Sequence, residues 1–392
     1  MKNEINILCD KYYNEFVNIR EYLHSNPELS SLEFNTTKFI KEKLKDYGVE
    51  ILDYSLKTGV IGIINRDKEG STIALRSDID ALPLEECTGL KYESKFKGIS
   101  HSCGHDIHMS SLLLTSKILS ELKDKINGRV IFIFQPAEEN LKGSNEIINT
   151  NFLKDLNINY ILAQHTWPFL ESGKIGLLKK EFMASSDFLK IEIIGKAGHG
   201  AHPEDCIDPI VISANIITAL QNIISRKISP LEGAVLTIGK ITGGSAPNII
   251  PDRVYLEGTI RTTNNNVREK IFNDIKTIVY NISKAMGAES KVEIVEGVPA
   301  LNNDESIVKK LETSSKSILG TENVVYLEKP SMGSEDFSNY LKFIPGAMFR
   351  LGTKNQNKLS ELGLHNPSVI FDTNSIFVGA KVMSKFILDY LT

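Results

Sequence analysis

Segments that resemble strands alternate with segments of helical spacing through much of the chain, and this alternation leaves few folds open. Val60–Ile64 and Thr72–Arg76 are predicted strands, and Val130–Phe134 and Tyr160–Gln164 are nearly continuous apolar runs. Such runs are typical of strands that are covered on both faces. Because a helix is predicted between them, from about Met109 to Ile126, the pattern predicts an α/β domain.

The middle of the chain follows a different pattern, in which strands and helices occur in the order βαββαβ. The strands are predicted at Phe188–Ile194, Ala234–Ile241, Asp252–Arg261 and Lys291–Gly297, and the helices at Ile207–Lys227 and Val267–Met286. This order is that of the ferredoxin-like unit. After Pro299 the α/β pattern resumes. The sequence therefore predicts one domain formed by residues 1–183 and 300–392, interrupted by an inserted domain at residues 184–299.

Charge and apolar content exclude several classes of protein. The 392 residues include 45 Lys and Arg against 49 Asp and Glu, a formal net charge of −4, which gives no basic footprint for nucleic acid. The longest apolar stretches are far too short to span a bilayer, and the first residues contain no signal-peptide core. The four cysteines of so long a chain do not make a disulfide framework. We expect a cytoplasmic protein that binds neither nucleic acid nor a membrane.

Segments rich in histidine, cysteine and carboxylates follow the predicted strands. They are Ser77–Asp80, His101–His108, Gln135–Glu139 and His165–Pro168, and a fifth, His365–Pro367, comes late in the chain. In open α/β sheets, sites form beyond the carboxyl ends of the strands. We therefore expect these segments to converge at one edge of the sheet.

The residue types in these segments are those of a metal site. Thiolate, imidazole and carboxylate are ligands of zinc, and overlapping sets bind manganese and cobalt. Cys103 and His105 can ligate from one tight loop. Because Glu138 and Glu139 are adjacent at a strand end, we expect that one ligates while the other faces a bound water. Metal-assisted hydrolysis requires such a second carboxylate, which takes the proton of the water.

Each segment also has an interpretation without function. Most Cys-x-His sequences, such as Cys103 and His105, do not bind a metal. Adjacent glutamates usually lie on a solvent-exposed face. His108 has the alternative of simply opening a helix, and His24, within RxxLHxxPEL, that of capping or packing. The coincidence of five such segments, three of them at predicted strand ends, favours the functional interpretation.

Longer motifs make the chain resemble a known family. In order they are SHSCGHDIH, QPAEEN, QHTWP, GKAGHGAHPEDCIDPI, GGSAPNIIPD with GTIRT, GSEDFSNYL and GLHNP. Over its whole length the chain resembles the metal-dependent amidohydrolases of the aminoacylase and carboxypeptidase G superfamily. It is most similar to the branch that holds hippurate hydrolase, N-acyl-L-amino-acid amidohydrolases, auxin-conjugate hydrolases and N-acetyldiaminopimelate deacetylase. The resemblance implies a catalytic domain with a central mixed sheet flanked by helices, and an inserted ferredoxin-like lid and dimerisation domain.

The resemblance implies a set of ligands for two divalent metal ions. Cys103 is implied to be shared by both ions. His105 and His165 are implied to complete one site, and Glu139 and His365 the other. Zinc and manganese are the metals that this branch suggests, with cobalt or nickel as further possibilities.

Catalytic roles are implied by the same resemblance. Glu138 is implied to be the general base. Asp80 is implied to orient a metal ligand by a hydrogen bond without binding the metal itself, and Asp78 and Asp106 are weaker candidates for the same role. His199, in the GKAGHGAHP segment, is implied to stabilise the tetrahedral oxyanion, at a site that can belong to the partner subunit.

The inserted domain also carries the residues that are implied to bind substrate. Asn248 and Arg261 match positions that hold a carboxylate or amide, and the guanidinium fork suits a carboxylate. A homodimer formed through the lid domain is implied as well. The chain departs from the family's pattern at Ala197, in place of a glycine, and at residues 368–372, where relatives carry an aromatic and acidic residues.

The implied reaction is hydrolysis of the amide bond of a small N-acyl amino acid, of the hippurate or N-acetyl type. Its products are a carboxylic acid and an amino acid. N-acetyldiaminopimelate deacetylation and metallocarboxypeptidase activity are alternatives on the same scaffold. Two rivals come from other classes, a thiol hydrolase with Cys103 as nucleophile and a non-catalytic binding protein. The thiol mechanism leaves the other ligand-type residues without a purpose.

Overall fold

The computed structural model describes residues 2–391, which divide into two compact units. The first unit contains the chain up to Lys180, Asn302–Lys329, and the chain from Asn339 onward. The second unit contains Glu181–Leu301 together with Pro330–Ser338. The sequence places the corresponding boundaries at 183/184 and 299/300, and assigns residues 330–338 to the first domain.

An eight-stranded mixed sheet forms the centre of the first unit, in the order β1-β2-β4-β3-β5-β16-β6-β15. Strands β4, β3, β5 and β16 are parallel, whereas β2 and β6 pair antiparallel at their sides. This confirms the predicted mixed sheet. The strands are β1 (Glu50–Leu52), β2 (Val60–Ile64), β3 (Ser71–Asp78), β4 (Gly128–Gln135), β5 (Tyr160–Glu171), β6 (Ile175–Leu177), β15 (Val324–Tyr326) and β16 (Gly346–Lys354).

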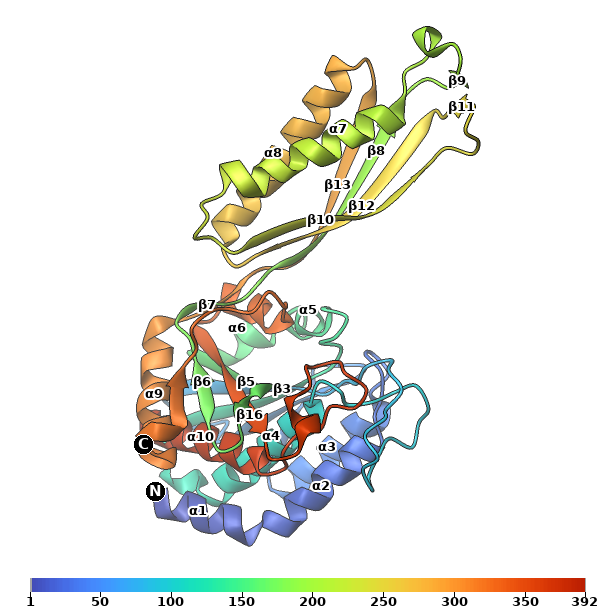
Figure 1. Ribbon diagram of the computed structural model, residues 1–392. Coiled ribbons are helices and arrows are strands. Elements are labelled where there is room, and N and C mark those ends of the chain that lie inside the picture. Colours follow the sequence, from blue (N-terminus) through green and yellow to red (C-terminus); the bar gives the residue numbers. More distant parts are fainter. Residues whose placement is uncertain (1, 392) are drawn as a thin grey trace. The chain divides into compact units, whose positions relative to one another are not determined.

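Helices surround this sheet (Figure 1). They are α1 (Lys2–Lys11), α2 (Tyr13–Ser25), α3 (Phe34–Asp46), α4 (His105–Glu121), α5 (Gly143–Ile148), α6 (Phe152–Leu156), α9 (Glu305–Leu319) and α10 (Ser375–Tyr390). Helix α4 is buried along most of its length, because it packs against α2, α10 and β3. Its first turn therefore has a fixed place beside the carboxyl end of β3.

Two predicted boundaries in this unit are wrong. The helix expected from about Met109 begins at His105. The strand expected to end at Gln164 continues to Glu171, so His165 lies within β5 and not after it. The apolar run stops at Gln164, but β16 continues to pair with β5 beyond that point, up to Glu171, and this pairing keeps the chain extended.

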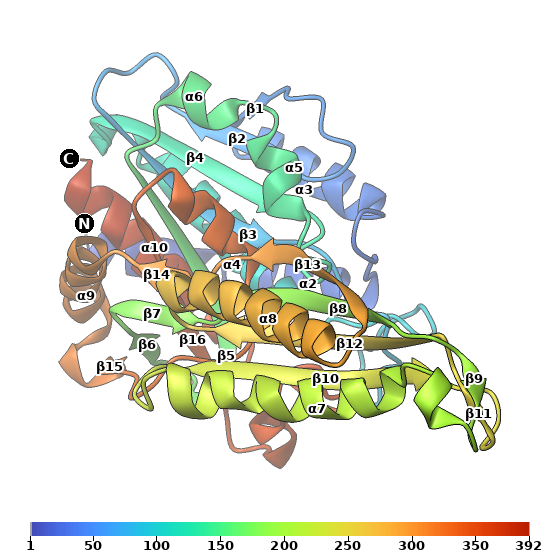
Figure 2. The ribbon, with the colours of Figure 1, turned by 90° about the horizontal axis from the view of Figure 1, so that it is seen from above.

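The second unit contains a four-stranded antiparallel sheet in the order β10-β12-β8-β13. Helices α7 and α8 lie side by side against it (Figure 2). The elements are β8 (Ser186–Ile194), β9 (Gly198–His199), α7 (Pro209–Asn222), β10 (Ala234–Gly243), β11 (Ile249–Ile250), β12 (Arg253–Thr262), α8 (Asn265–Ala285) and β13 (Glu289–Val298). At two of the points where the chain passes from one unit to the other, β7 (Lys180–Met183) pairs with β14 (Leu301–Asn303). The predicted βαββαβ order is confirmed.

Side-chain alternation explains why only one face of this sheet carries helices. Along β8, Leu189, Ile191 and Ile193 are buried while Lys190 between them is exposed, which is the period expected of a strand with one covered face. The buried side chains join those of α7 and α8 in one core. Helix α7 is shorter than predicted, since residues 223–227 form a π-helical turn.

Among residues 2–391, no helix is both long enough and apolar enough to cross a membrane.

Candidate metal centre

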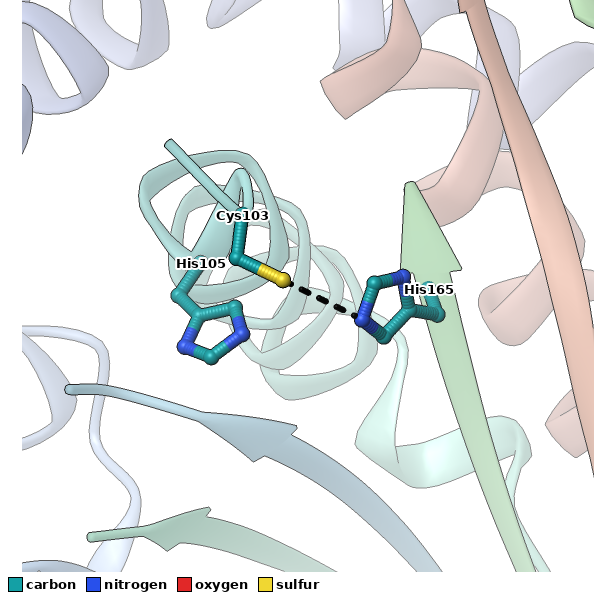
Figure 3. Close-up of side chains that lie close together, drawn as sticks. All are labelled: Cys103, His105 and His165. Atoms are coloured by element: carbon teal, nitrogen blue, oxygen red, sulfur yellow. Dashed lines mark hydrogen bonds between the residues drawn. The ribbon is translucent and has the colours of Figure 1, made fainter. Parts of the chain in front are cut away.

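The loop that carries Cys103 is held against strand β5. Gly104 has a φ of 83°, and a Cβ atom there would lie 2.7 Å from the Thr166 side chain, so the position requires glycine. The Thr166 hydroxyl donates a hydrogen bond to the carbonyl oxygen of Cys103 at 2.6 Å. The next residue, His105, begins α4. Cys103 and His105 therefore project from a constrained turn (Figure 3).

Two clusters of metal-ligand atoms share Cys103. One contains Cys103, His105 and His165, and the other contains Cys103, Glu139 and His365, with the ligand atoms of each within 4.8 Å of one another. Cys103 Sγ lies 3.6 Å from His165 Nε2, and Glu139 Oε1 lies 3.6 Å from His365 Nε2. Two ligands with bonds of about 2.0–2.3 Å to one tetrahedral ion lie roughly 3.3–3.8 Å apart. The spacing therefore suits metal coordination.

The orientation of His105 leaves one ring nitrogen for a metal. Its Nδ1 lies 2.8 Å from the carbonyl oxygen of Asp80, so Nε2 faces Glu139 Oε1 at 3.7 Å. These two atoms are buried, and neither has a hydrogen-bond partner among residues 2–391. Buried polar atoms without partners are rare, and a divalent cation would satisfy both. The residues present therefore fit a metal.

His365 lies in a loop that is tied to the Cys103 loop. Its backbone N–H donates to the carbonyl oxygen of Ser102 at 2.9 Å, and its φ of 64° is unusual for a residue with a side chain. The His365 side chain is 54% exposed, whereas His105 and His165 are buried. The second cluster is thus open to solvent on the side of His365.

The two glutamates follow strand β4 as predicted, but they lie in a turn and not in extended backbone. Strand β4 ends at Gln135, and Ala137 already has a φ of 54°. Carboxylate oxygens of both Glu138 and Glu139 lie within 4.8 Å of a His105 nitrogen. The expectation that only one of them faces the metal site rests on strand alternation, which does not apply in a turn.

The electrostatics of the site depend on burial and on crowded carboxylates. Burial, and then the Glu139 carboxylate, raise the pKa of the Cys103 thiol well above its usual value. Burial by itself lowers the pKa of His105, but the Asp78 carboxylate helps to outweigh it and the pKa rises to about 10. Burial holds the pKa of His165 well below its usual value. A divalent cation favours thiolate and neutral imidazole, and would relieve this crowding of negative charge.

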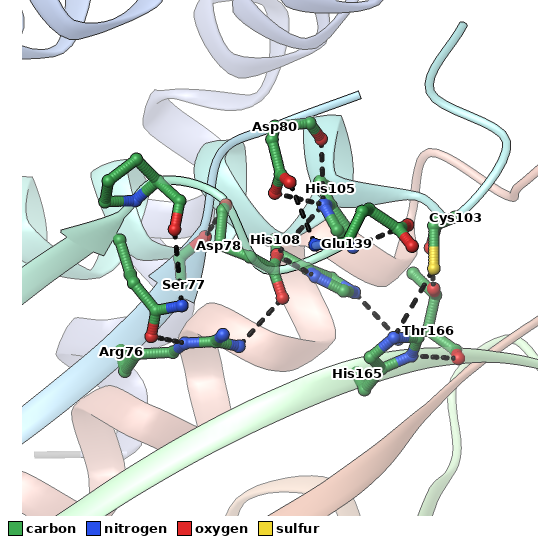
Figure 4. Close-up of polar contacts among 12 residues, drawn as sticks. Arg76, Ser77, Asp78, Asp80, Cys103, His105, His108, Glu139, His165 and Thr166 are labelled. Carbon is green, nitrogen blue, oxygen red and sulfur yellow. Dashed lines mark hydrogen bonds and ion pairs between the residues drawn. The ribbon is translucent and has the colours of Figure 1, made fainter. Parts of the chain in front are cut away.

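A second layer of polar side chains lies behind the ligands (Figure 4). His108 Nε2 accepts a hydrogen bond from Thr166 N–H at 2.8 Å, so Nδ1 carries the proton and donates to Asp78 Oδ1 at 2.6 Å. Arg76 donates to the other Asp78 oxygen at 2.8 Å. His108 also lies near Asp78 and His105 in a third cluster, but both of its ring nitrogens are occupied. In this arrangement neither ring nitrogen of His108 is left for a metal.

The N-terminal motif reaches the same layer from α2. Arg20 and His24 are four residues apart on one face of this helix, and both bond Asp106 Oδ2, at 2.8 and 3.0 Å. His24 also contacts Glu86 at 3.0 Å. Burial tends to raise the pKa of Asp106, but Arg20 and His24 outweigh it and hold that pKa well below its usual value. The sequence leaves capping or packing as an alternative for His24. In the structure His24 bonds Asp106, which directly follows the proposed ligand His105.

The second unit brings His199 and Asn248 together. His199 lies on the short strand β9, and Asn248 lies directly before its partner strand β11. Gly200 N–H donates to the carbonyl oxygen of Asn248 at 2.9 Å. His199 Nδ1 accepts from Ala201 N–H at 3.0 Å. The neutral His199 ring therefore carries its proton on Nε2, and the residue is exposed.

Arg261 lies far from these two residues within the same unit. Strand β12 has 10 residues, so its ends lie roughly 30 Å apart at about 3.3 Å per residue. Strands β9 and β11 lie beyond one end of the sheet (Figure 1), and Arg261 is next to the last residue at the other end. Its guanidinium donates to Met332 O at 3.4 Å and to Ser334 Oγ at 3.3 Å.

Comparison with known proteins gives the class of this chain. The model of Peptidase family M20/M25/M40 matches residues 74–389. N-acetyl-L-cysteine deacetylase of Bacillus subtilis is 41% identical over 362 residues, 92% of this chain and 85% of the relative. Hippurate hydrolase of Campylobacter jejuni is 37% identical over 378 residues, 96% of this chain and 97% of the relative. The Bacillus subtilis YXEP protein, a dinuclear metal binding peptidase of the M20 family, superposes with a TM-score of 0.86 at 32% identity, covering 97% and 99% of the two chains.

The chain belongs to Peptidase family M20/M25/M40. It is a metal-dependent amidohydrolase, and two divalent ions fit its pair of clusters.

Proposed function

We propose that this protein hydrolyses the amide bond of N-acyl amino acids, releasing a carboxylic acid and a free amino acid. The observation that carries the proposal is the pair of ligand clusters joined through Cys103. The relatives named N-acetyl-L-cysteine deacetylase and hippurate hydrolase support this substrate class. Their acyl groups differ, so the family leaves the acyl preference open.

We assign five residues as metal ligands. His105 and His165 hold one ion with Cys103, and Glu139 and His365 hold the other with Cys103. When bound, the two ions lower the pKa of a coordinated water and polarise the substrate carbonyl. The thiolate favours zinc, while manganese, cobalt and nickel also accept imidazole and carboxylate ligands.

Glu138 is the proposed general base. It takes a proton from the attacking water and passes it to the leaving amine nitrogen. It is 5% exposed, so most of its surface is shielded from bulk water. Asp80 keeps the neighbouring groups in place, because its carboxylate accepts Glu139 N–H at 2.9 Å and its carbonyl oxygen faces His105 Nδ1 at 2.8 Å.

The second unit supplies the proposed lid, with residues that bind the substrate and stabilise the oxyanion. The Nε2–H group of His199 donates a hydrogen bond to the oxyanion, Arg261 binds the substrate carboxylate, and Asn248 binds the amide or carboxylate. Arg261 lies at the opposite end of β12 from His199 and Asn248. This distance is greater than the length of a small N-acyl amino acid. We therefore propose a homodimer through the second unit, in which one copy supplies His199 and Asn248 and the other supplies Arg261.

Release of free amine from a panel of substrates tests the function. Metal-stripped protein is assayed with N-acetylcysteine, hippurate, N-acetyldiaminopimelate and a dipeptide, with and without added zinc or manganese. Metal-dependent release from an N-acyl amino acid is expected, and the subset cleaved identifies the acyl and amino-acid preference. Cleavage of the dipeptide alone would favour a carboxypeptidase.

Two other outcomes would contradict the proposal. Activity that survives stringent metal removal would favour Cys103 as a nucleophile. Inertness toward the whole panel, with two metal ions bound per chain by elemental analysis, would favour a binding protein.

A further inference from the structure

Glu33 is a buried carboxylate that the proposed mechanism does not use. It lies directly before α3 with 0% of its surface exposed. Its Oε1 accepts hydrogen bonds from Ala137 N–H at 2.8 Å and from Ser31 N–H at 2.9 Å. Its Oε2 is buried without a hydrogen-bond partner among residues 2–391. Burial, and to a smaller extent the Asp80 charge, raise the pKa of Glu33. Because burial disfavours an acidic side chain at this position, its presence suggests that it has a specific role.

The partner of Glu33 is the first residue of the turn that presents Glu138 and Glu139. Ala137 has a φ of 54°, a conformation that a residue with a side chain keeps only when its surroundings hold it. The carbonyl oxygen of Ala137 accepts from Gly143 N–H at 3.1 Å. A Cβ atom on Gly143 would lie 1.6 Å from the Pro136 carbonyl oxygen. The turn is therefore closed on one side by its own backbone and on the other by Glu33.

The same N-terminal segment also fastens the far side of the turn through Asp80. Asp80 Oδ2 accepts from Glu139 N–H at 2.9 Å and from the Ser30 hydroxyl at 2.7 Å. Ala81 N–H donates to the carbonyl oxygen of Glu28 at 2.8 Å. Residues 28–33 thus bind the N–H of Ala137 directly, through Glu33. They hold the N–H of Glu139 indirectly, through Asp80.

We propose that Glu33 is a positioning residue, which holds the Ala137 amide so that Glu138 and Glu139 keep their places at the metal centre. Glu33 Oε1 accepts from two backbone amides at once, at 2.8 and 2.9 Å, and a buried amide without an acceptor is costly, which explains an acceptor side chain at this buried position. The consequence for catalysis rests on the proposed function, but the consequence for the turn itself does not.

The test compares Glu33→Ala and Glu33→Gln with Ile307→Val in the full-length, metal-loaded protein. Gln keeps an oxygen acceptor at the same distance from the backbone. Ile307 is a buried core residue of α9, and its substitution matches a modest loss of stability without touching the turn. The measurements are hydrogen exchange of the peptide that covers residues 136–143, metal affinity by equilibrium dialysis, and kcat and KM on the best substrate of the panel.

Glu33→Ala is expected to speed exchange in residues 136–143, and to lower metal affinity and kcat by about 10- to 100-fold with little change in KM. Glu33→Gln is expected to recover most of each loss, and Ile307→Val to resemble the wild type. A folded Glu33→Ala protein whose exchange, metal affinity and kcat match those of Ile307→Val would overturn the proposal.

Two controls separate the possible failures. If the wild-type protein cleaves no substrate, the proposed function fails, while exchange and metal affinity still decide the role of Glu33. If Glu33→Ala does not fold, Glu33→Asp replaces it, because the shorter side chain cannot reach Ala137 N–H. Wild-type exchange in residues 136–143 of that variant would equally overturn the proposal.

Discussion

The proposed functional side chains of the two units differ in how deeply they are buried. In the first unit, His105 and His165 are buried, and each has one ring nitrogen fixed by a backbone carbonyl, at 2.8 and 2.9 Å. In the second unit, His199 and Asn248 are exposed, although Ala201 N–H donates to His199 Nδ1 at 3.0 Å. Arg261 donates two long hydrogen bonds, of 3.3 and 3.4 Å. The proposed metal ligands are buried and preorganised, whereas the proposed substrate-binding residues are more exposed.

This difference follows from what each set of residues must do. Metal ligands lose affinity when their geometry drifts, so the residues behind them, such as Asp80 and His108, are part of the site. Groups that bind a substrate gain from adjustment on closure of a lid. We expect substitutions in the first unit to act through metal and chemistry, and substitutions in the second to act through the substrate.

The largest effect is expected at Glu138, which tests whether the adjacent carboxylates have separate roles. Glu138→Ala should lower kcat by about 10²- to 10⁴-fold, as expected for loss of a general base, while both metal ions stay bound. Glu139→Ala should instead release one ion. Metal content by elemental analysis, alongside kcat, measures both variants. Loss of metal from Glu138→Ala with retention in Glu139→Ala would reverse the two assignments.

Metal removal is expected to destabilise the first unit alone. At a free metal concentration about 1,000 times the Kd, each of the two ions adds roughly 4 kcal/mol to the free energy of unfolding. For a unit of this size, each ion then shifts the Tm by about 10 °C, and loss of both by about 20 °C. Hydrogen exchange should speed up around residues 101–108 and 136–143, and stay unchanged in residues 188–298. Equal destabilisation of both units would show that the second unit also depends on the metal.

The second unit's contribution is expected to appear at His199. His199→Ala should lower kcat by about 10²- to 10³-fold, the range for an oxyanion donor, with metal content unchanged. If the residue acts across a dimer, mixing His199→Ala with Glu138→Ala chains should restore about a quarter of wild-type activity for random two-fold pairing. Arg253→Ala, an exposed residue of the same unit, is the control. Verified mixed dimers without activity would place the site within one chain.

The sequence predicts the fold class and the βαββαβ order because both depend on periodic patterns. It also predicts the segments that carry Cys103, His105, Glu139, His165 and His365, because reactive residue types gather at the ends of strands. The structure brings these five side chains into two clusters, and their individual roles stay predictions. The pattern does not predict every detail, since His165 lies inside β5 and the turn after β4 holds both glutamates out of the strand's side-chain alternation.

Residues that work through backbone partners leave no such signal. Glu33 bonds the Ala137 amide, 104 positions away in the sequence, and His108 accepts from the Thr166 amide, 58 positions away. An amide is present at every residue except proline, so nothing in the sequence marks which one a side chain will meet. His108 lies in a segment that the sequence already singles out, but its backbone partner is seen only in the fold, and for Glu33 only the fold shows that the residue belongs to the site.

The smallest effect is expected at His108, and it separates support of the site from ligation. His108→Ala leaves Thr166 N–H and Asp78 Oδ1 without their partner, so the backbone beside His165 loosens. We expect kcat or metal affinity to fall by about 10- to 100-fold with two ions still bound at saturating metal. Thr115→Val, which removes a buried hydrogen bond to Ser111 on the same helix, should leave both values near wild type. If His108→Ala instead lowers the number of ions bound at saturation, His108 is a ligand, and the proton assigned to its Nδ1 is wrong.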